Sequence, residues 1–192
     1  MGNLAELGRE LFYGIRRRRN YHKAFPLILQ AARSGWVHWQ YLAGYSLAHG
    51  LGVERNLRAA RRWYAKAGSK RHPGALFNLA LMYDQGRGVR HDYRRAFRLY
   101  EKGAKLGDPA AQCNLALAYL DGRGTARSLR DAIRWFRMAA AKGDPKAQYN
   151  LGLAYLEGEG VRKSKGRARG WFLKAAKQGH RRAEKLLSQP KP

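Results

Sequence analysis

The chain has 192 residues, and 39 Lys and Arg against 13 Asp and Glu give it a net charge of +26. Its hydrophobic content of 45%, with five Trp and eleven Tyr, excludes a disordered chain, because that much apolar surface can offset the entropy lost on ordering. One cysteine excludes an internal disulfide, and no run of 18 apolar residues marks a membrane span. The charge favours an acidic partner.

Several residue types recur every 36 positions along the chain. The recurring glycines are Gly14, Gly50, Gly86, Gly122 and Gly158, the alanines are Ala24, Ala60, Ala96, Ala132 and Ala168, and a second glycine series is Gly35, Gly107, Gly143 and Gly179. A fixed period of this length is typical of a solenoid, in which a unit buries its apolar face only when a neighbour stacks on it. We therefore predict an all-α superhelix of five antiparallel helix hairpins with a short C-terminal capping helix.

The predicted repeats form one solenoid domain over residues 1–192. They cover residues 1–36, 37–72, 73–108, 109–144 and 145–180, and residues 181–192 form a cap and tail. The first repeat is degenerate, because Pro26 falls inside its second helix and is expected to kink or break the first turns. Gly166 and Gly170 are expected to weaken the last long helix.

Helix boundaries within each repeat follow from capping residues. The first helix, helix A, begins at pairs such as Asp108-Pro109, where an N-cap acceptor precedes a proline at the first helical position. It ends at a glycine such as Gly86, which can adopt the left-handed conformation. The second helix, helix B, begins after a column of N-cap residues, namely Asn20, Asn56, Asp92, Ser128 and Ser164. The Gly-x-Gly at Gly86 and Gly88 follows a helix rather than a strand, so a phosphate-binding loop is not expected.

The repeat pattern resembles the Sel-1-like repeat family, which is related to the tetratricopeptide repeats. Residues 145–179 carry the Leu-Gly-x-x-Tyr-x-x-Gly-x-Gly-Val pattern and, in helix B, Ala168, Trp171-Phe172 and a closing Gly179. The resemblance runs from 37 to 180 and more loosely through 1–36, with Thr125-Ala126 as a departure. It implies non-catalytic adaptor or scaffold work in complexes, or an inhibitory, immunity-type role, without naming the partner.

Helix A is apolar on both sides of its helical wheel. One side, around Leu79, is expected to be core. The other side either packs against neighbouring helices or forms the concave ligand groove that the resemblance implies. The candidate groove residues are Tyr41, Tyr45, Phe77, Leu81, Asp84, Leu117, Asp121, Tyr149, Leu153 and Glu157. The acidic ones either pair with Arg87 or Arg123 or recognise a cationic group on a ligand.

Helix A contains almost no positive charge. Of the 39 Lys and Arg, only Arg9 and Lys146 lie in its five predicted segments, which are residues 1–13, 37–49, 73–85, 109–121 and 145–157. Helix B carries basic stripes at i, i+4 and i+8 spacing, formed by Arg58, Arg62, Lys66, Arg94, Arg98, Lys102, Arg130 and Arg134. This face is either simply solvated or binds an acidic protein, nucleic acid or an anionic membrane surface. Trp63, Trp135 and Trp171 are expected in the core, which leaves the basic face without interleaved aromatic residues.

No catalytic or metal-binding pattern is present in the sequence. The six histidines are scattered, and Cys113 is expected to be a packed thiol. We therefore expect neither an enzyme nor a metal or cofactor. The expected function is protein or peptide binding by a monomer or weak oligomer, with nucleic-acid binding through helix B as the alternative. The expected compartment is the cytoplasm, or the periplasm or exterior if a leader peptide has been removed.

Overall fold

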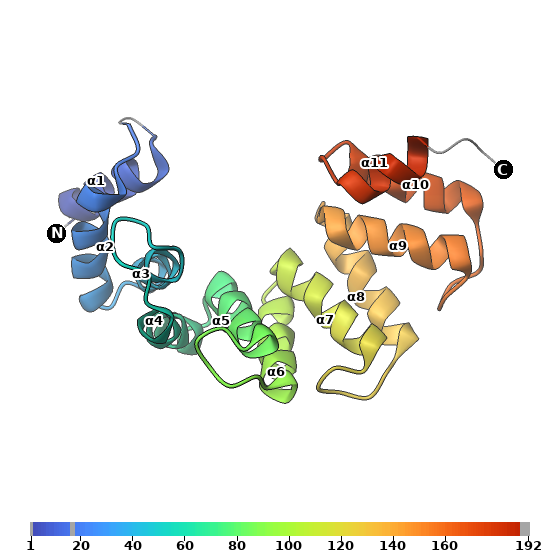
Figure 1. The fold of residues 1–192 in the computed structure, drawn as a ribbon, viewed down its shortest axis with the longest axis horizontal. Coiled ribbons are helices and arrows are strands. Elements are labelled where there is room, and N and C mark those ends of the chain that lie inside the picture. Colours follow the sequence, from blue (N-terminus) through green and yellow to red (C-terminus); the bar gives the residue numbers. More distant parts are fainter. Residues whose placement is uncertain (1, 16–17, 189–192) are drawn as a thin grey trace. The chain divides into compact units, whose positions relative to one another are not determined.

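The computed structural model describes residues 2–15 and 18–188, with side chains from residue 5 onward. Within these residues it contains eleven α-helices and no strand (Figure 1). The helices are α1 (Gly2–Tyr13), α2 (Tyr21–Arg33), α3 (Val37–His49), α4 (Leu57–Ser69), α5 (Pro73–Gln85), α6 (Tyr93–Lys105), α7 (Pro109–Asp121), α8 (Leu129–Ala141), α9 (Pro145–Glu157), α10 (Lys165–Ala176) and α11 (Arg181–Ser188). The predicted all-α fold of five hairpins and a short last helix is confirmed. Residues 189–192 of the predicted tail lie outside the described residues.

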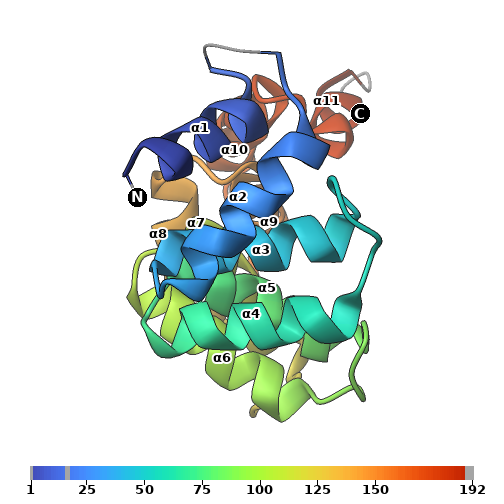
Figure 2. The same cartoon turned by 90° about the vertical axis from the view of Figure 1, so that its left-hand side faces the viewer.

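Internal contacts group the chain into two compact units, Met1–Leu99 and Tyr100–Pro192, which are described separately. In the first unit each of the helices α1 to α5 packs against the next. Figure 2 shows α3 and α4 lying side by side as one hairpin. In the second unit α7 to α11 pack in the same successive way. The extent of a single domain over 1–192 stays a prediction.

The predicted N-caps of helix B are all present. The Asn20 and Asn56 side chains accept hydrogen bonds from the backbone N–H groups of Lys23 at 3.0 Å and Ala59 at 2.9 Å. The same bond is made by the other three members of the column, Asp92, Ser128 and Ser164. An oxygen in this position satisfies a backbone donor that has no partner within the helix.

Helix α3 has Trp36 at its N-cap without a side-chain bond, whereas the N-caps of α5, α7, α9 and α11 use two residue types that do make one. Asp108 and Asp144 accept from Ala111 and Ala147 N–H, each at 2.7 Å. In the corresponding position, the Nδ1 atoms of His72 and His180 accept from Ala75 N–H at 3.2 Å and Ala183 N–H at 3.3 Å. An accepting Nδ1 must be unprotonated, so each of these caps requires a neutral histidine.

The Gly-x-Gly loops have a packing role. Gly86 ends α5 in the left-handed conformation with φ 65°. Two residues later Gly88, with φ 70°, approaches α4 so closely that an added Cβ would lie 2.5 Å from the Leu57 Cβ. Gly52 and Gly160 approach the starts of α2 and α8 in the same way, so these loops after helix A pack on the start of the preceding helix B, which explains the motif without a phosphate.

Small residues on helix A face aromatic rings on helix B within two of the hairpins. A Cβ on Gly44 would lie 2.8 Å from Cδ1 of Tyr64, and one on Gly152 would lie 2.5 Å from Cε1 of Phe172. Both rings are buried. The glycines therefore set how closely α3 approaches α4 and α9 approaches α10.

One expectation about helix breakers differs in part from the structure. Helix α2 continues through Pro26 to Arg33, so the expected break is wrong, while the alternative of a kink stays a prediction. Pro26 removes one backbone donor, while the Asn20 cap and the buried Ala24, Ile28 and Ala32 hold the helix on its neighbours. Gly166 and Gly170 lie within helix α10, and the weakening expected from them stays a prediction.

Candidate protein-interaction surfaces

The predicted groove residues keep some of their surface exposed in both units. We call them the helix-A face: Tyr41, Tyr45, Phe77, Leu81 and Asp84 in the first unit, and Leu117, Asp121, Tyr149, Leu153 and Glu157 in the second. All are half-buried except two exposed acidic residues, Asp121 and Glu157. Neighbouring helices cover part of each apolar side chain and leave the rest available for a contact.

In one repeat, the residue that corresponds to Tyr41 on the helix-A face is buried. Cys113 occupies the place of Tyr41, Phe77 and Tyr149 in its repeat but is only 1% exposed. Burial raises the pKa of its thiol far above the usual value, and the neighbouring Asp144 raises it further. The predicted packed thiol is confirmed, since a thiol that stays protonated is a poor nucleophile.

Tyrosines of helix A stack on the histidines that cap the next helix A. The Tyr41 and His72 rings have centroids 4.5 Å apart, and those of Tyr149 and His180 are 4.6 Å apart. His72 Nε2 also lies 3.3 Å from Nδ1 of His38. Because His72 Nδ1 accepts from Ala75, its proton is on Nε2, which donates to His38. Burial, and then the charge of His38, lowers the pKa of His72.

One cavity in the first unit is lined mostly by aromatic residues. It has a volume of about 420 Å³ and lies between the end of α1, the start of α2 and α3. We call it the aromatic pocket, and it is lined by Phe12, Tyr13, Arg19, Tyr21, Tyr41, Leu42, Tyr45, His49 and Leu51. Tyr41 and Tyr45 belong to the predicted groove, and sequence reasoning missed the others.

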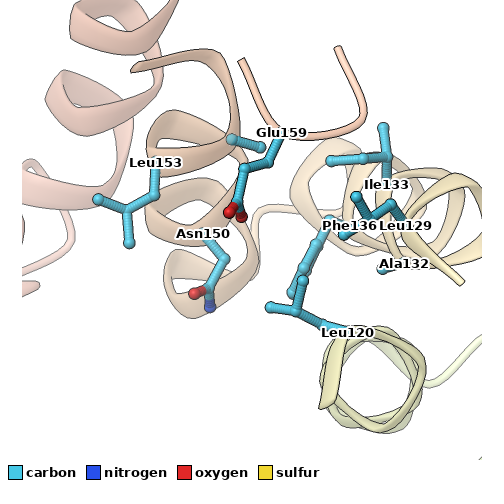
Figure 3. Close-up of a pocket in the computed structure, with 9 residues that line it drawn as sticks. Leu120, Leu129, Ala132, Ile133, Phe136, Asn150, Leu153 and Glu159 are labelled. Carbon is cyan, nitrogen blue, oxygen red and sulfur yellow. The ribbon is translucent and has the colours of Figure 1, made fainter. Parts of the chain in front are cut away.

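A smaller pocket lies between α7, α8 and α9 in the second unit and encloses about 90 Å³ (Figure 3). Figure 3 shows Asn150, Leu153 and Glu159 on the α9 side and Phe136 and Ile133 on the α8 side. Its other lining residues are Leu120, Leu129, Ala132 and Ala154. The predicted groove residue Leu153 therefore lies at a real opening.

The same pocket recurs two repeats earlier in the first unit, with a volume of about 30 Å³. There Met82 stands in the place of Ala154, which explains the smaller space, and Arg87 stands in the place of Glu159. Related hollows along the chain therefore differ in size and in the sign of the charge at their rims.

The predicted basic face of helix B is solvent-exposed at every one of its residues. We call these residues the helix-B basic face: Arg58, Arg62, Lys66, Arg94, Arg98, Lys102, Arg130 and Arg134. The expectation about the tryptophans holds for Trp135, which is 9% exposed, and is wrong for Trp63 and Trp171, which are only half-buried. The Lys66 ammonium lies 5.2 Å from the Trp63 ring centroid, and that of Lys174 lies 4.3 Å from the Trp171 centroid. Aromatic rings therefore do accompany the basic side chains.

The acidic residues near the ends of helix A were predicted either to pair locally or to recognise a ligand. For Asp121 the local pair is present, because its Oδ2 lies 3.1 Å from Nε of Arg123. Among residues 2–15 and 18–188, no group of three His, Cys, Asp or Glu is placed to hold a metal. Over the same residues, no helix is long and apolar enough to cross a membrane.

These features define the class of a helical-repeat protein built from stacked hairpins. The Sel1 repeat matches residues 4–36, 40–72, 73–108, 109–144 and 145–180. The chain therefore belongs to the Sel1 repeat family, whose members are generally non-catalytic protein-interaction scaffolds.

Solved structures agree with this assignment. A Sel1 repeat protein from Oxalobacter formigenes is 30% identical, has a TM-score of 0.90, and matches 97% of this chain and 76% of its own. The protective antigen c5321 of uropathogenic Escherichia coli is 29% identical with a TM-score of 0.85, over 95% of this chain and 39% of its own. Immunity protein Pa5087 of Pseudomonas aeruginosa, 19% identical with a TM-score of 0.64 over 95% of this chain and 69% of its own, shares the fold.

A curated relative matches over a short stretch. The chitin synthase regulator SKT5 of Saccharomyces cerevisiae is 34% identical over 61 residues, which is 32% of this chain. The match spans only 9% of the length of that regulator. It agrees with the repeat assignment over that stretch.

Proposed function

We propose that this chain is a non-catalytic adaptor that binds another protein or a peptide on its helix-A face. The observation that carries the proposal is the chemistry of that face: its apolar side chains are only half-buried, and helix A contains almost none of the basic residues of the chain. Apolar surface left open on a repeat protein is a common mark of a binding site. Half-exposed tyrosines suit it, because they offer rigid apolar area with a polar tip.

The net charge of +26 favours an acidic partner. Such a charge attracts an acidic protein during diffusional encounter, and apolar contacts on the helix-A face then provide affinity. An inhibitory role is the narrower form of this proposal. The immunity protein from Pseudomonas aeruginosa shares the fold of this chain, and the yeast regulator matches it over 61 residues.

Affinity capture from the native host, followed by binding measurements on the purified partner, tests this proposal. Leu81→Ala and Leu153→Ala remove contact area from the helix-A face and keep helix propensity. Arg94→Ala and Arg130→Ala are the matched controls on the helix-B basic face. We expect one stoichiometric partner, at least a tenfold weaker affinity for the leucine variants, and little change for the controls. Recovery of no partner, or unchanged binding by both leucine variants, would contradict the proposal.

Nucleic-acid binding through the helix-B basic face is the second candidate function. The cations beside the half-exposed Trp63 and Trp171 favour it, because bases can stack on exposed rings near positive charge. Binding of this kind is dominated by phosphate contacts and weakens steeply as salt increases. The candidate fails if a single-stranded oligonucleotide does not bind at low salt, or if its affinity is the same at 50 and 500 mM salt.

A further inference from the structure

The walls of the aromatic pocket form one continuous cluster of rings. Phe12, at 7% exposure, lies at its base and meets Tyr21 edge-on at 5.4 Å and Tyr45 at 6.4 Å between centroids. Tyr13 lies beside Phe12 at 5.0 Å and is 41% exposed, so it stands at the rim. The cavity of about 420 Å³ has room for one planar side chain with part of its backbone.

The charge around the pocket is positive. Arg19 lines it, with its guanidinium carbon 5.9 Å from the Tyr21 ring centroid, and none of the lining residues is acidic. The charge of Arg9 acts on Tyr13. Burial, and then the charges of Arg87 and Arg55, lowers the pKa of His49. A carboxylate is therefore favoured at the mouth, and a cationic ligand is disfavoured.

The pocket continues onto the helix-A face of the first unit. Tyr41 lines the pocket, lies 6.1 Å from Tyr45, and stacks on His72 at the start of α5. An added Cβ on Gly74, also in α5, would lie 3.3 Å from the Tyr41 ring. Because Tyr41 and Tyr45 belong both to the pocket and to the helix-A face, a ligand that fills the pocket also contacts that face on α3, which suits a peptide segment better than a compact small molecule.

We propose that the aromatic pocket binds a segment of a partner protein in which an aromatic side chain is flanked by Asp or Glu residues. The aromatic ring enters the cavity and packs against Phe12, Tyr21 and Tyr45, and a flanking carboxylate pairs with Arg19. The inference rests on the proposed protein-binding function and adds to it a location and a partner chemistry. It places the most selective contact in the first repeat, where the periodic pattern is weakest.

Fluorescein-labelled synthetic peptides test the pocket directly by fluorescence anisotropy. The probe is Asp-Glu-Phe-Asp-Glu with blocked ends, and the comparison peptides replace Phe by Ala or the acidic residues by Lys. Tyr13→Ala and Arg19→Glu alter the pocket. Tyr93→Ala is the matched control for the tyrosine, since Tyr93 is 40% exposed and lies outside the lining residues. Arg58→Glu makes the same charge change as Arg19→Glu on the exposed helix-B basic face.

We expect saturable binding of the Phe probe, at least tenfold tighter than that of either comparison peptide. Tyr13→Ala and Arg19→Glu should each weaken it at least tenfold, and Tyr93→Ala and Arg58→Glu less than twofold. Circular dichroism melting should show that all four variants stay folded, because the substituted side chains are exposed. Equal losses with Arg19→Glu and Arg58→Glu would indicate general charge attraction and overturn the inference, as would equal binding of the Phe and Ala peptides.

The pocket and the proposed function can fail separately. If the captured partner loses affinity with Leu81→Ala or Leu153→Ala but not with Tyr13→Ala or Arg19→Glu, and the probe does not bind, the pocket inference is wrong and the proposed function stands. If no protein partner binds in any form, the proposed function is wrong. The anisotropy experiment then decides whether the pocket recognises the probe chemistry.

Discussion

Tyr41 stacks on His72 with ring centroids 4.5 Å apart and an interplanar angle of 17°. The pairing joins the helix-A face to the cap of the next helix A, because the Nδ1 atom of the same imidazole accepts from Ala75 N–H. Tyr149 and His180 repeat the arrangement in the second unit. One contact thus couples a candidate binding residue to a titratable structural group.

The first prediction concerns pH. The pKa of His72 is lowered from 6.5 by burial and by His38, and the pKa of His38 is itself lowered by burial and Arg9. The unfolded chain therefore binds more protons than the folded chain in the range just below pH 6.5. The contribution of these two neutral histidines to the free energy of unfolding is therefore fully present above pH 6.5. It is lost as the pH falls from 6.5 toward their lowered pKa values in the folded protein.

Urea unfolding between pH 5 and 7.5 checks this. His72→Ser replaces the imidazole with a hydroxyl, which can still cap α5 but does not titrate in this range. We expect the free energy of unfolding of the wild-type protein to decrease below pH 6.5 and the decrease to be smaller in the variant. Equal pH dependence in both proteins would show that His72 does not contribute.

The second prediction is that replacing glycine by alanine stabilises the protein at two positions and destabilises it at a third. Gly166→Ala and Gly170→Ala should each stabilise the protein by about 0.5–1 kcal/mol, because an added Cβ meets nothing within 4 Å and alanine favours the helix. Gly152→Ala should destabilise it by about 1–3 kcal/mol, because its Cβ would overlap the buried Phe172 ring. Urea denaturation measures the change in the free energy of unfolding for each of the three variants. A stabilising Gly152→Ala would refute the close packing of α9 on α10.

The third prediction concerns buried glutamines. The Gln112 side-chain amide donates to the Ala104 carbonyl at 3.1 Å, and Gln40 and Gln148 bond in the same way to Ala32 and Ala140. Gln112→Ala should cost about 1–3 kcal/mol, because it leaves a cavity and an unpaired carbonyl.

Gln112→Leu should cost less, because leucine fills the space and Leu76 occupies the corresponding position of another repeat, where it is 4% exposed. The Gln112 Oε1 atom, moreover, is buried without a hydrogen-bond partner, so its replacement relieves that cost. Thermal melting compares the two variants. A larger loss with leucine than with alanine would contradict this account.

Part of this architecture was predictable from the sequence, because stacked hairpins repeat their constraints every 36 residues. The N-cap column from Asn20 to Ser164 and the end of α5 at Gly86 follow from residue type at fixed spacing. The Gln112 bond was not anticipated, since polarity alone does not show which carbonyl an amide reaches.

Most of the aromatic pocket could not be predicted in the same way. Phe12, Tyr13 and Arg19 belong to the degenerate first repeat, where no periodic column marks them, and only the folded structure shows that they line one pocket with residues of α3. The exposure of Trp63 was also missed, because periodicity identifies an apolar position but not how far its neighbours cover it. These properties depend on tertiary contacts.

The fourth prediction concerns the single thiol. Cys113 is buried and its pKa is strongly raised, so it should react with Ellman's reagent far more slowly in the folded protein than in urea. The absorbance time course at pH 8 measures both rates. Equal rates in the folded and unfolded protein would show that the Cys113 thiol, and with it the helix-A face of this repeat, is accessible to solvent.

Hydroxyl-radical footprinting of the purified complex tests the central claim most directly. Oxidation of Tyr41, Tyr45 and Tyr149 on the helix-A face is compared with oxidation of Trp63 and Trp171 on helix B, all of which are half-buried in the free protein. We predict that partner binding protects the tyrosines and leaves the tryptophans unchanged. Protection of the tryptophans with unchanged tyrosines would contradict the account.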